Sequence, residues 1–213
     1  MNNKFTTLTF ITLLLVTNNL SAALYDRGDG FIYDDDLDIT WLQDANYANT
    51  SNANLSYSLG RMTHADAVAW TDSLNLAGGS NWRLPSAGEN PSMGYSSADE
   101  LGHMFFNNLG NSGSFANSTF IDGETGLTVS FENVQNFYWL NEEINGNKAW
   151  SFYMAMGFMM DNNNINNKLY TWAVHDGDIA NSVDLAAVPV PASALLFGSA
   201  LLGLMVTRRQ ANQ

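Results

Sequence analysis

The stretch Ala149-Trp-Ser-Phe-Tyr-Met-Ala-Met156 places a large apolar side chain at every second position. Trp150, Phe152, Met154 and Met156 alternate with smaller or more polar residues. A period of two over six to eight residues is typical of a β-strand that buries one face. We therefore expect a strand here, with a sheet built around it.

Other segments with strand character lie on both sides of this stretch. Phe137–Leu140 is a short apolar run, and Lys168–Val174 repeats the alternation. Between the two alternating stretches, the polar segment Asp161–Asn167 is expected to be a loop that joins neighbouring antiparallel strands. Near the N-terminus, Phe31–Tyr33 and Ile39–Leu42 are two further short β-like pieces.

Two helices are expected in the first half of the chain. Thr63–Asp66 and Ser97–Glu100 both have the pattern of a capping box, in which a hydroxyl residue is followed three positions later by an acid. Apolar residues then recur at helical spacing. They are Ala67, Trp70 and Leu74 in the first case, and Leu101, Met104, Phe105 and Leu109 in the second. Early helices and late strands predict a single compact α+β domain with an antiparallel sheet and two helices.

The N-terminal residues 1–23 have the order of a secretory signal peptide. Lys4 is followed by the apolar run Leu8–Val16 and then by small residues, so we expect cleavage after Ala22 or Ala23. An ordinary N-terminal helix is the alternative. The apolar run is too short to span a bilayer, which needs about 20 residues.

The C-terminal residues 188–213 contain a second apolar segment. Residues 192–206 carry no charge, and Arg208 and Arg209 follow them. We expect a transmembrane helix at about 192–206 with the two arginines on the cytoplasmic side. A buried core helix is the alternative, although the segment has no polar face.

The motif at the start of this segment resembles a known sorting signal. Val188-Pro189-Val190-Pro191-Ala192, the apolar span and Arg208-Arg209 are similar in order to the PEP-CTERM signal, in its Val-Pro-x-Pro-Ala variant. That resemblance implies that an exosortase, a membrane protease-transpeptidase of Gram-negative bacteria, is a transient partner. The chain would then pass through the inner membrane and reach the cell surface or the extracellular space.

The charge of the remaining body, residues 24–187, excludes several classes of function. It has five basic residues against 21 acidic ones, a formal charge of −16. Nucleic-acid binding requires a basic face and is therefore not expected. The chain has no cysteine, which excludes disulfides, thiolate metal sites and thiol nucleophiles. We find no nucleotide-binding glycine motif and no metal-ligand spacing among the histidines, and so expect no cofactor.

The body also resembles a bacterial domain family. Tyr25–Asp34 leading into Thr40–Asp44, Trp82-Arg83-Leu84-Pro85, and the Trp-rich segments between Phe137 and Val174 are similar to the Lcl C-terminal domain. This family is named after the end of a Legionella collagen-like adhesin, and the resemblance spans roughly residues 24–179. The Trp-Arg-Leu-Pro element is also similar to a stretch of formylglycine-generating enzymes, which implies a C-type-lectin-like fold. Those enzymes need cysteines that this chain lacks.

Two groups of charged residues are candidate sites. Arg83 is expected to be a buried structural anchor within the Trp82–Pro85 motif, with recognition of a carboxylate or sulfate as the alternative. Asp34, Asp36 and Asp38 lie in a turn and are weak candidates for calcium ligands, against the simpler interpretation of a solvated turn. The Trp-rich strands are expected to form core, and a sugar-stacking platform is the alternative.

No set of nucleophile and base is visible, so we expect no catalytic residues. The sequence favours a non-catalytic binding or structural module of the cell surface or biofilm matrix, associated with exopolysaccharide. Its expected ligand is a neutral glycan or a surface protein. A secreted enzyme acting on exopolysaccharide is the alternative.

Overall fold

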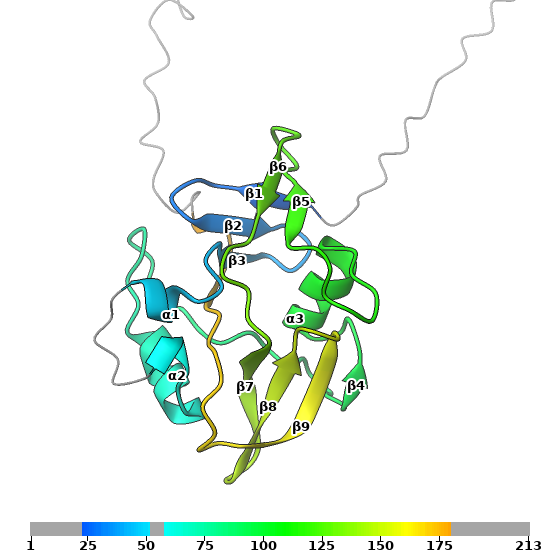
Figure 1. The fold of residues 1–213 in the computed structure, drawn as a ribbon. Helices are drawn as coiled ribbons and strands as arrows, with labels where there is room; N and C mark the ends of the chain where they lie inside the picture. The colour runs from blue at the N-terminus through cyan, green and yellow to red at the C-terminus, as the bar shows by residue number, and fades with distance from the viewer. Residues whose placement is uncertain (1–22, 52–57, 180–213) are drawn as a thin grey trace, which may run out of the picture.

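The computed structural model of the chain describes residues 23–51 and 58–179 (Figure 1). Strands dominate this part, and the helical segments are short. The strands are β1 (Leu24–Asp26), β2 (Phe31–Asp34), β3 (Ile39–Leu42), β4 (Gly94–Tyr95), β5 (Thr119–Ile121), β6 (Thr128–Ser130), β7 (Phe137–Asn145), β8 (Lys148–Tyr153), β9 (Phe158–Asn164) and β10 (Val174–Asp176). The helical segments are α1 (Tyr47–Thr50), a 3-10 turn (Ser58–Gly60), α2 (His64–Asp72), α3 (Glu100–His103) and the π-helical turn η2 (Met104–Asn108).

The strands form two four-stranded sheets and one hairpin, and all their pairings are antiparallel. The strand order is β1-β2-β3-β10 in the first sheet and β4-β9-β8-β7 in the second, while β5 and β6 form the hairpin. Val174 of β10 lies opposite Trp41 of β3, so the last strand returns to the sheet in which the chain begins. The fold is a mostly β domain with antiparallel sheets and few helices, which has more sheet and less helix than we expected.

The helix expected after Thr63 is confirmed as α2. The Thr63 hydroxyl accepts a hydrogen bond from the Asp66 backbone N–H at 3.3 Å and donates one to the Asp66 carboxylate at 2.6 Å. Ala67 and Trp70 are buried, as the helical spacing predicts. The helix ends at Asp72, so Leu74, which we expected on the same helical face, lies beyond it and is only partly buried.

The second helix begins later than its sequence pattern indicates. Its N-cap is Asp99, whose carboxylate accepts from the Gly102 N–H at 2.7 Å, so the capping box that we placed at Ser97 is wrong. α3 then passes directly into η2. The predicted apolar face is nevertheless buried along its whole length, at Leu101, Met104, Phe105 and Leu109.

The polar segment Asp161–Asn167 is mostly strand, not the loop we expected. β9 continues to Asn164 and stays paired with β8 as far as Lys148. The chain turns instead before β9, where Gly157 has a φ of +69°. Polar side chains did not exclude a strand here because strand pairing uses only backbone groups.

The strand expected over Lys168–Val174 is divided between different partners. Leu169 bridges to Met62, and Tyr170 bridges to Tyr138 on the outer edge of β7. Regular pairing resumes only at Val174, where β10 begins. This segment therefore connects the second sheet to the first.

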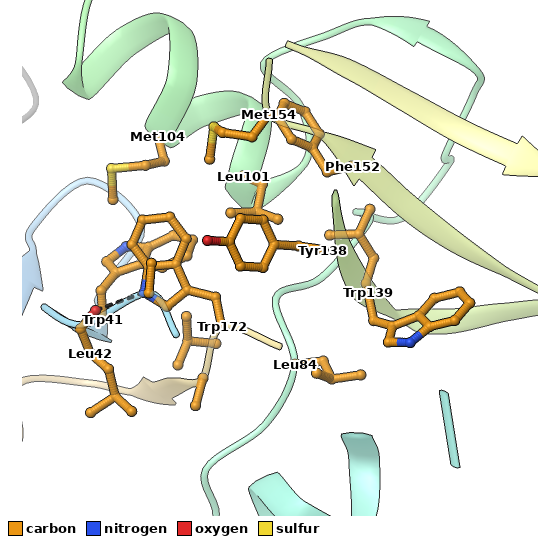
Figure 2. Packing of buried hydrophobic residues seen from close by; sticks show 14 of the residues in the cluster. Trp41, Leu42, Leu84, Leu101, Met104, Tyr138, Trp139, Phe152, Met154 and Trp172 are labelled. Atoms are coloured by element: carbon orange, nitrogen blue, oxygen red, sulfur yellow. Dashed lines mark hydrogen bonds between the residues drawn. The ribbon is translucent and has the colours of Figure 1, made fainter. Parts of the chain in front are cut away.

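The tryptophans fill the interior between the elements. Trp41, Trp82, Trp139 and Trp172 are fully buried, and Trp150 is only 8% exposed. The Trp172 indole N–H donates to the Leu42 carbonyl at 2.7 Å, and the rings of Trp41 and Trp172 meet edge to face at 5.1 Å (Figure 2). The tryptophans of the Trp-rich segments are thus core residues, as expected, and do not form an exposed sugar platform.

Several expectations concern residues outside the described part. The signal peptide up to Ala22, the motif Val188-Pro189-Val190-Pro191-Ala192, the expected span at 192–206 and Arg208-Arg209 all lie there. Among residues 23–51 and 58–179, no helix is long and apolar enough to cross a bilayer.

Candidate functional site

The Trp82–Pro85 motif lies against the first sheet and extends it by one backbone pair. The Arg83 N–H donates to the Val174 carbonyl at 2.8 Å, and the Val174 N–H donates back at 2.9 Å. Trp82, Leu84 and Pro85 are buried. The motif therefore holds β10 from the side opposite β3.

The guanidinium of Arg83 is saturated by partners from its own chain. Both its terminal nitrogens bind the Glu100 carboxylate, at 2.9 and 2.8 Å, and Nε and Nη2 bind Asp176 at 2.9 and 2.6 Å. Nη1 also donates to the Leu84 carbonyl at 3.0 Å. Burial alone lowers the pKa of Arg83, but hydrogen bonds and attraction to these carboxylates outweigh it and raise the pKa above its usual range. This geometry is that of an anchor and leaves no donor pair open for an anion.

Further carboxylates next to Arg83 fix the backbone that follows the motif. Glu100 also accepts from the Ser86 N–H at 2.8 Å, while Glu142 accepts from the Ser86 hydroxyl at 2.7 Å and the Ala87 N–H at 2.6 Å. Burial raises the pKa of the nearby Asp99 to about 7, and the charges of Glu100 and Glu142 contribute to the rise.

The aspartates of the turn between β2 and β3 have separate partners. The buried Asp34 accepts from the Asp36 N–H at 3.2 Å and from the Asn108 amide at 3.0 Å, and its burial raises its pKa. Asp36 lies 3.2 Å from His103, and Asp38 accepts from the Tyr33 hydroxyl at 3.0 Å. Burial and that hydrogen bond raise the pKa of Tyr33 to about 12. Within the described residues, no three acids or histidines gather as a metal centre.

A groove of about 260 Å³ lies beside α1 and is the strongest candidate for a ligand site. Among residues 23–51 and 58–179, it is lined by three acids and two aromatic rings and by no Lys or Arg. The lining residues come from five segments: Asp29, Gly30 and Phe31; Leu42, Gln43 and Asp44; Tyr47 and Thr50; Leu76 and Ala77; and Glu132.

Local backbone geometry builds the walls of this groove. Gly28, Asp29 and Gly30 all have positive φ values, of 75°, 52° and 85°, and so form the tight turn between β1 and β2. The Gln43 N–H donates to the Gly30 carbonyl at 2.8 Å. Asp44 accepts from the Asn46 N–H at 2.8 Å and the Thr50 hydroxyl at 2.5 Å, which positions α1 and its Tyr47.

Several polar groups of the groove have no partner of their own. In the described part of the chain, the side chains of Asp29, Tyr47 and Glu132 make no hydrogen bond, whereas Gln43 donates to the Ser130 carbonyl at 2.9 Å. The groove is therefore lined by two exposed carboxylates and a phenol that have no partner within the described part of the chain and can bond to a ligand in place of water. Such a site can bind a ligand rich in hydroxyl groups and disfavours an anion.

Sequence reasoning did not identify this groove. The lining residues come from distant segments, and their spacing matches no known binding motif. Asp29 to Phe31 and Leu42 to Asp44 lie in segments that carry the resemblance to the bacterial domain, but that resemblance indicated no site there. The structure brings these segments together but keeps Arg83 and the Asp34–Asp38 turn outside the groove.

Comparison with known families identifies the domain. The model of the Lcl C-terminal domain matches residues 30–175, so the chain belongs to this family. The match includes all the groove residues except Asp29. Comparisons with curated proteins and with solved structures gave no match.

Proposed function

We propose that this member of the Lcl C-terminal domain family is a non-catalytic module that binds a neutral glycan of the cell surface or biofilm matrix in the groove beside α1. The observation that carries this proposal is the combination of the Tyr47 ring with unused polar groups in one concave site. Sugar rings present an apolar face to an aromatic ring and hydroxyl groups to its polar neighbours. Tyr47, Asp29 and Glu132 offer both kinds of contact.

The charge of the groove selects among glycans. Asp29, Asp44 and Glu132 line it without a basic residue, and the whole body carries an excess of acids. A sulfated or carboxylated polymer would approach against this charge both at long range and at contact. A neutral polysaccharide has no such cost. A surface protein is the alternative ligand.

The test compares several neutral polymers with a sulfated one, and the pair dextran and dextran sulfate isolates the effect of charge. The full chain is purified in a zwitterionic detergent, and its binding to dextran, galactomannan and mixed-linkage β-glucan is measured beside dextran sulfate, each with and without EDTA. We expect binding to at least one neutral polymer, unaffected by EDTA. Tyr47→Ala should weaken it about tenfold, the loss expected for one central aromatic contact. Tyr47→Phe, which keeps the ring, should bind nearly as well.

Two results would contradict the proposal. The first is strong binding to dextran sulfate that EDTA leaves intact and salt weakens. The second is neutral-glycan binding that survives Tyr47→Ala unchanged. Loss of binding in EDTA would instead indicate a bridging cation.

Export and sorting are also part of the proposal. The resemblance of residues 1–23 to a signal peptide and of Val188–Arg209 to the PEP-CTERM signal supports passage through the inner membrane, cleavage by an exosortase and release at the cell surface. Mass spectrometry of the surface and secreted pools should find no peptide beyond about Ala192. Recovery of peptides containing Arg208 from the mature extracellular protein would contradict it.

The finer fold assignment is a proposal as well. A C-type-lectin-like classification is supported by the first and last strands sharing one sheet while the second sheet is built from the residues between them. An experimental structure that fails to superpose on C-type lectin domains would overturn it.

An enzyme acting on exopolysaccharide is the second candidate function. Asp44 and Glu132 are neighbours through a backbone bridge and line the same groove, and glycosidases use such carboxylate pairs. Asp44, however, already accepts two hydrogen bonds that hold α1. Release of reducing ends from a neutral polymer, lost in Glu132→Gln, would favour the enzyme over the binding module.

A further inference from the structure

A second cleft, of about 330 Å³, lies beside β4 and shares no residue with the groove. Residues 87–92 form one wall, and Ser96 and Ala98 form the other, with Met159 of β9 between them. Ser96 also borders a shallower hollow of about 240 Å³ that includes Tyr95, Ser97 and Phe106. Ser96 lines both depressions, so Tyr95 lies next to the cleft in the neighbouring hollow.

Hydrogen bonds fix the walls of this cleft in the absence of a ligand. The Ala87 N–H donates to Glu142 at 2.6 Å, and the Gly88 N–H donates to the Ser86 hydroxyl at 3.0 Å. The walls also touch, since a methyl group at Gly88 would lie 2.9 Å from the Ala98 carbonyl oxygen. A site that is already formed loses little conformational entropy when a ligand binds.

The cleft has free hydrogen-bonding groups, and an exposed aromatic ring lies in the hollow beside it. Among the described residues, the side chains of Glu89, Asn90 and Ser92 have no hydrogen-bond partner. Tyr95 is 59% exposed, yet its ring is held edge to face against Phe158 at 5.0 Å. An ordered ring that remains in solvent beside free amide and hydroxyl groups has the composition of a sugar-binding surface.

We infer that the β4 cleft, with Tyr95, is a second site for the same neutral glycan, so that one chain holds two polymer segments together. This inference rests on the proposed function. Like the groove, the cleft is lined by no Lys or Arg of the described part of the chain, and Glu89 is the one acid among its described lining residues. α1 and β4 lie on opposite flanks of the domain (Figure 1), and the two sites share no lining residue, so they are separate. Two sites on opposite flanks bind separate segments and cross-link a matrix.

The number of sites per chain tests the inference. Short oligosaccharides are prepared from whichever neutral polymer the full chain binds best, and their stoichiometry is measured by calorimetry in the zwitterionic detergent. We expect two oligosaccharides per wild-type chain, one per Tyr95→Ala chain and one per Tyr47→Ala chain. Tyr95→Phe should retain two, because it keeps the ring.

Binding to the intact polymer gives a second readout. Loss of one of two linked sites removes avidity, so Tyr95→Ala, like Tyr47→Ala, should bind the long polymer at least about tenfold more weakly and should no longer raise its viscosity. Ile144→Ala, which alters an exposed apolar residue of β7 that lines neither site, should change neither property.

The outcomes separate this inference from the proposed function. One oligosaccharide per wild-type chain, unchanged in Tyr95→Ala and lost in Tyr47→Ala, would overturn the second site and leave the groove standing. The reverse pattern, with binding lost only in Tyr95→Ala, would move the proposed function to the cleft and refute the double site. No binding of any neutral polymer would contradict both.

Discussion

Arg83 holds two carboxylates from distant parts of a strongly acidic chain. Glu100 belongs to α3 and Asp176 to β10, so the guanidinium joins a helix to the last strand of the first sheet. Its side chain is 26% exposed, and that of Glu100 is 15% exposed. An ion pair shielded to this degree is costly to break from one side, because the remaining charge keeps its burial without its partner.

Arg83→Ala should therefore lower the free energy of unfolding by about 3 kcal/mol, near the low end for a buried pair because part of the group is exposed. Thermal and urea denaturation would measure the change. Arg61→Ala is the matched control, because Arg61 makes no ion pair among the described residues and only a cation–π contact to Tyr170, at 6.0 Å. A melting temperature within one degree of wild type would show that Arg83 is not a structural anchor.

Asp99 gives a prediction about pH. Burial raises its pKa to about 7 in the folded domain, against about 4 in the unfolded chain. The folded state thus binds a proton that the unfolded state releases between pH 4 and pH 7, so this group makes the fold less stable as the pH rises through that window.

Asp99→Asn keeps an N-cap acceptor for the Gly102 N–H and removes the titration. Wild type loses stability as the pH rises from 4 to 7, and the variant should not. The free energy of unfolding of the variant minus that of wild type should therefore increase across this window, by a few kcal/mol at most, and stay constant above pH 8. Urea denaturation of both proteins at each pH measures the difference. A constant difference across the window would contradict the raised pKa.

At the scale of elements, hydrophobic spacing predicted which helix residues are buried better than it predicted where each helix or strand begins and ends. The buried positions of α2 and α3 follow from helical periodicity, yet Asp99 took the cap that the pattern gave to Ser97. Both residues can cap a helix, and only the path of the incoming chain decides between them. β9 was missed for a related reason, since Asn and Asp side chains carry no periodic signal even where their backbone is paired.

The turn between β8 and β9 gives a prediction at this scale. Gly157 has a φ of +69°, and a methyl group there would lie 2.5 Å from the Phe105 ring. Gly157→Ala should destabilise the domain by about 2–4 kcal/mol, from backbone strain together with overpacking. Gly146→Ala, in the turn between β7 and β8, is the control, because no atom lies within 4 Å of its added methyl group. Equal denaturation midpoints for the two variants would contradict the close packing of this turn against Phe105.

At the scale of the whole molecule, the sequence predicted what is buried but not what is grouped at the surface. The Trp-rich strands correctly indicated a core built largely from aromatic residues. The groove could not be predicted in this way, because Asp29, Tyr47 and Glu132 come from distant segments that only the tertiary fold brings together. A site assembled from distant segments leaves no spacing in the sequence to recognise.

The last prediction concerns the independence of the domain from the ends of the chain. The core of the described part begins at Leu24 and ends at Ile179, and β1 and β10 lie in one sheet, so both ends of the body are tied into the same structure. A chain shortened to residues 24–187 should therefore stay soluble and unfold in one cooperative transition, with a free energy of about 5–15 kcal/mol.

Circular dichroism and urea denaturation, followed in the near and far ultraviolet, would measure this transition. Coincident curves at both wavelengths are expected, since a domain with a complete core loses its packing and its strands together. A shortened chain that binds a hydrophobic dye and lacks a near-ultraviolet signal would instead be a molten species. That result would show that residues beyond 187 belong to the fold and that the division between domain and sorting tail is wrong.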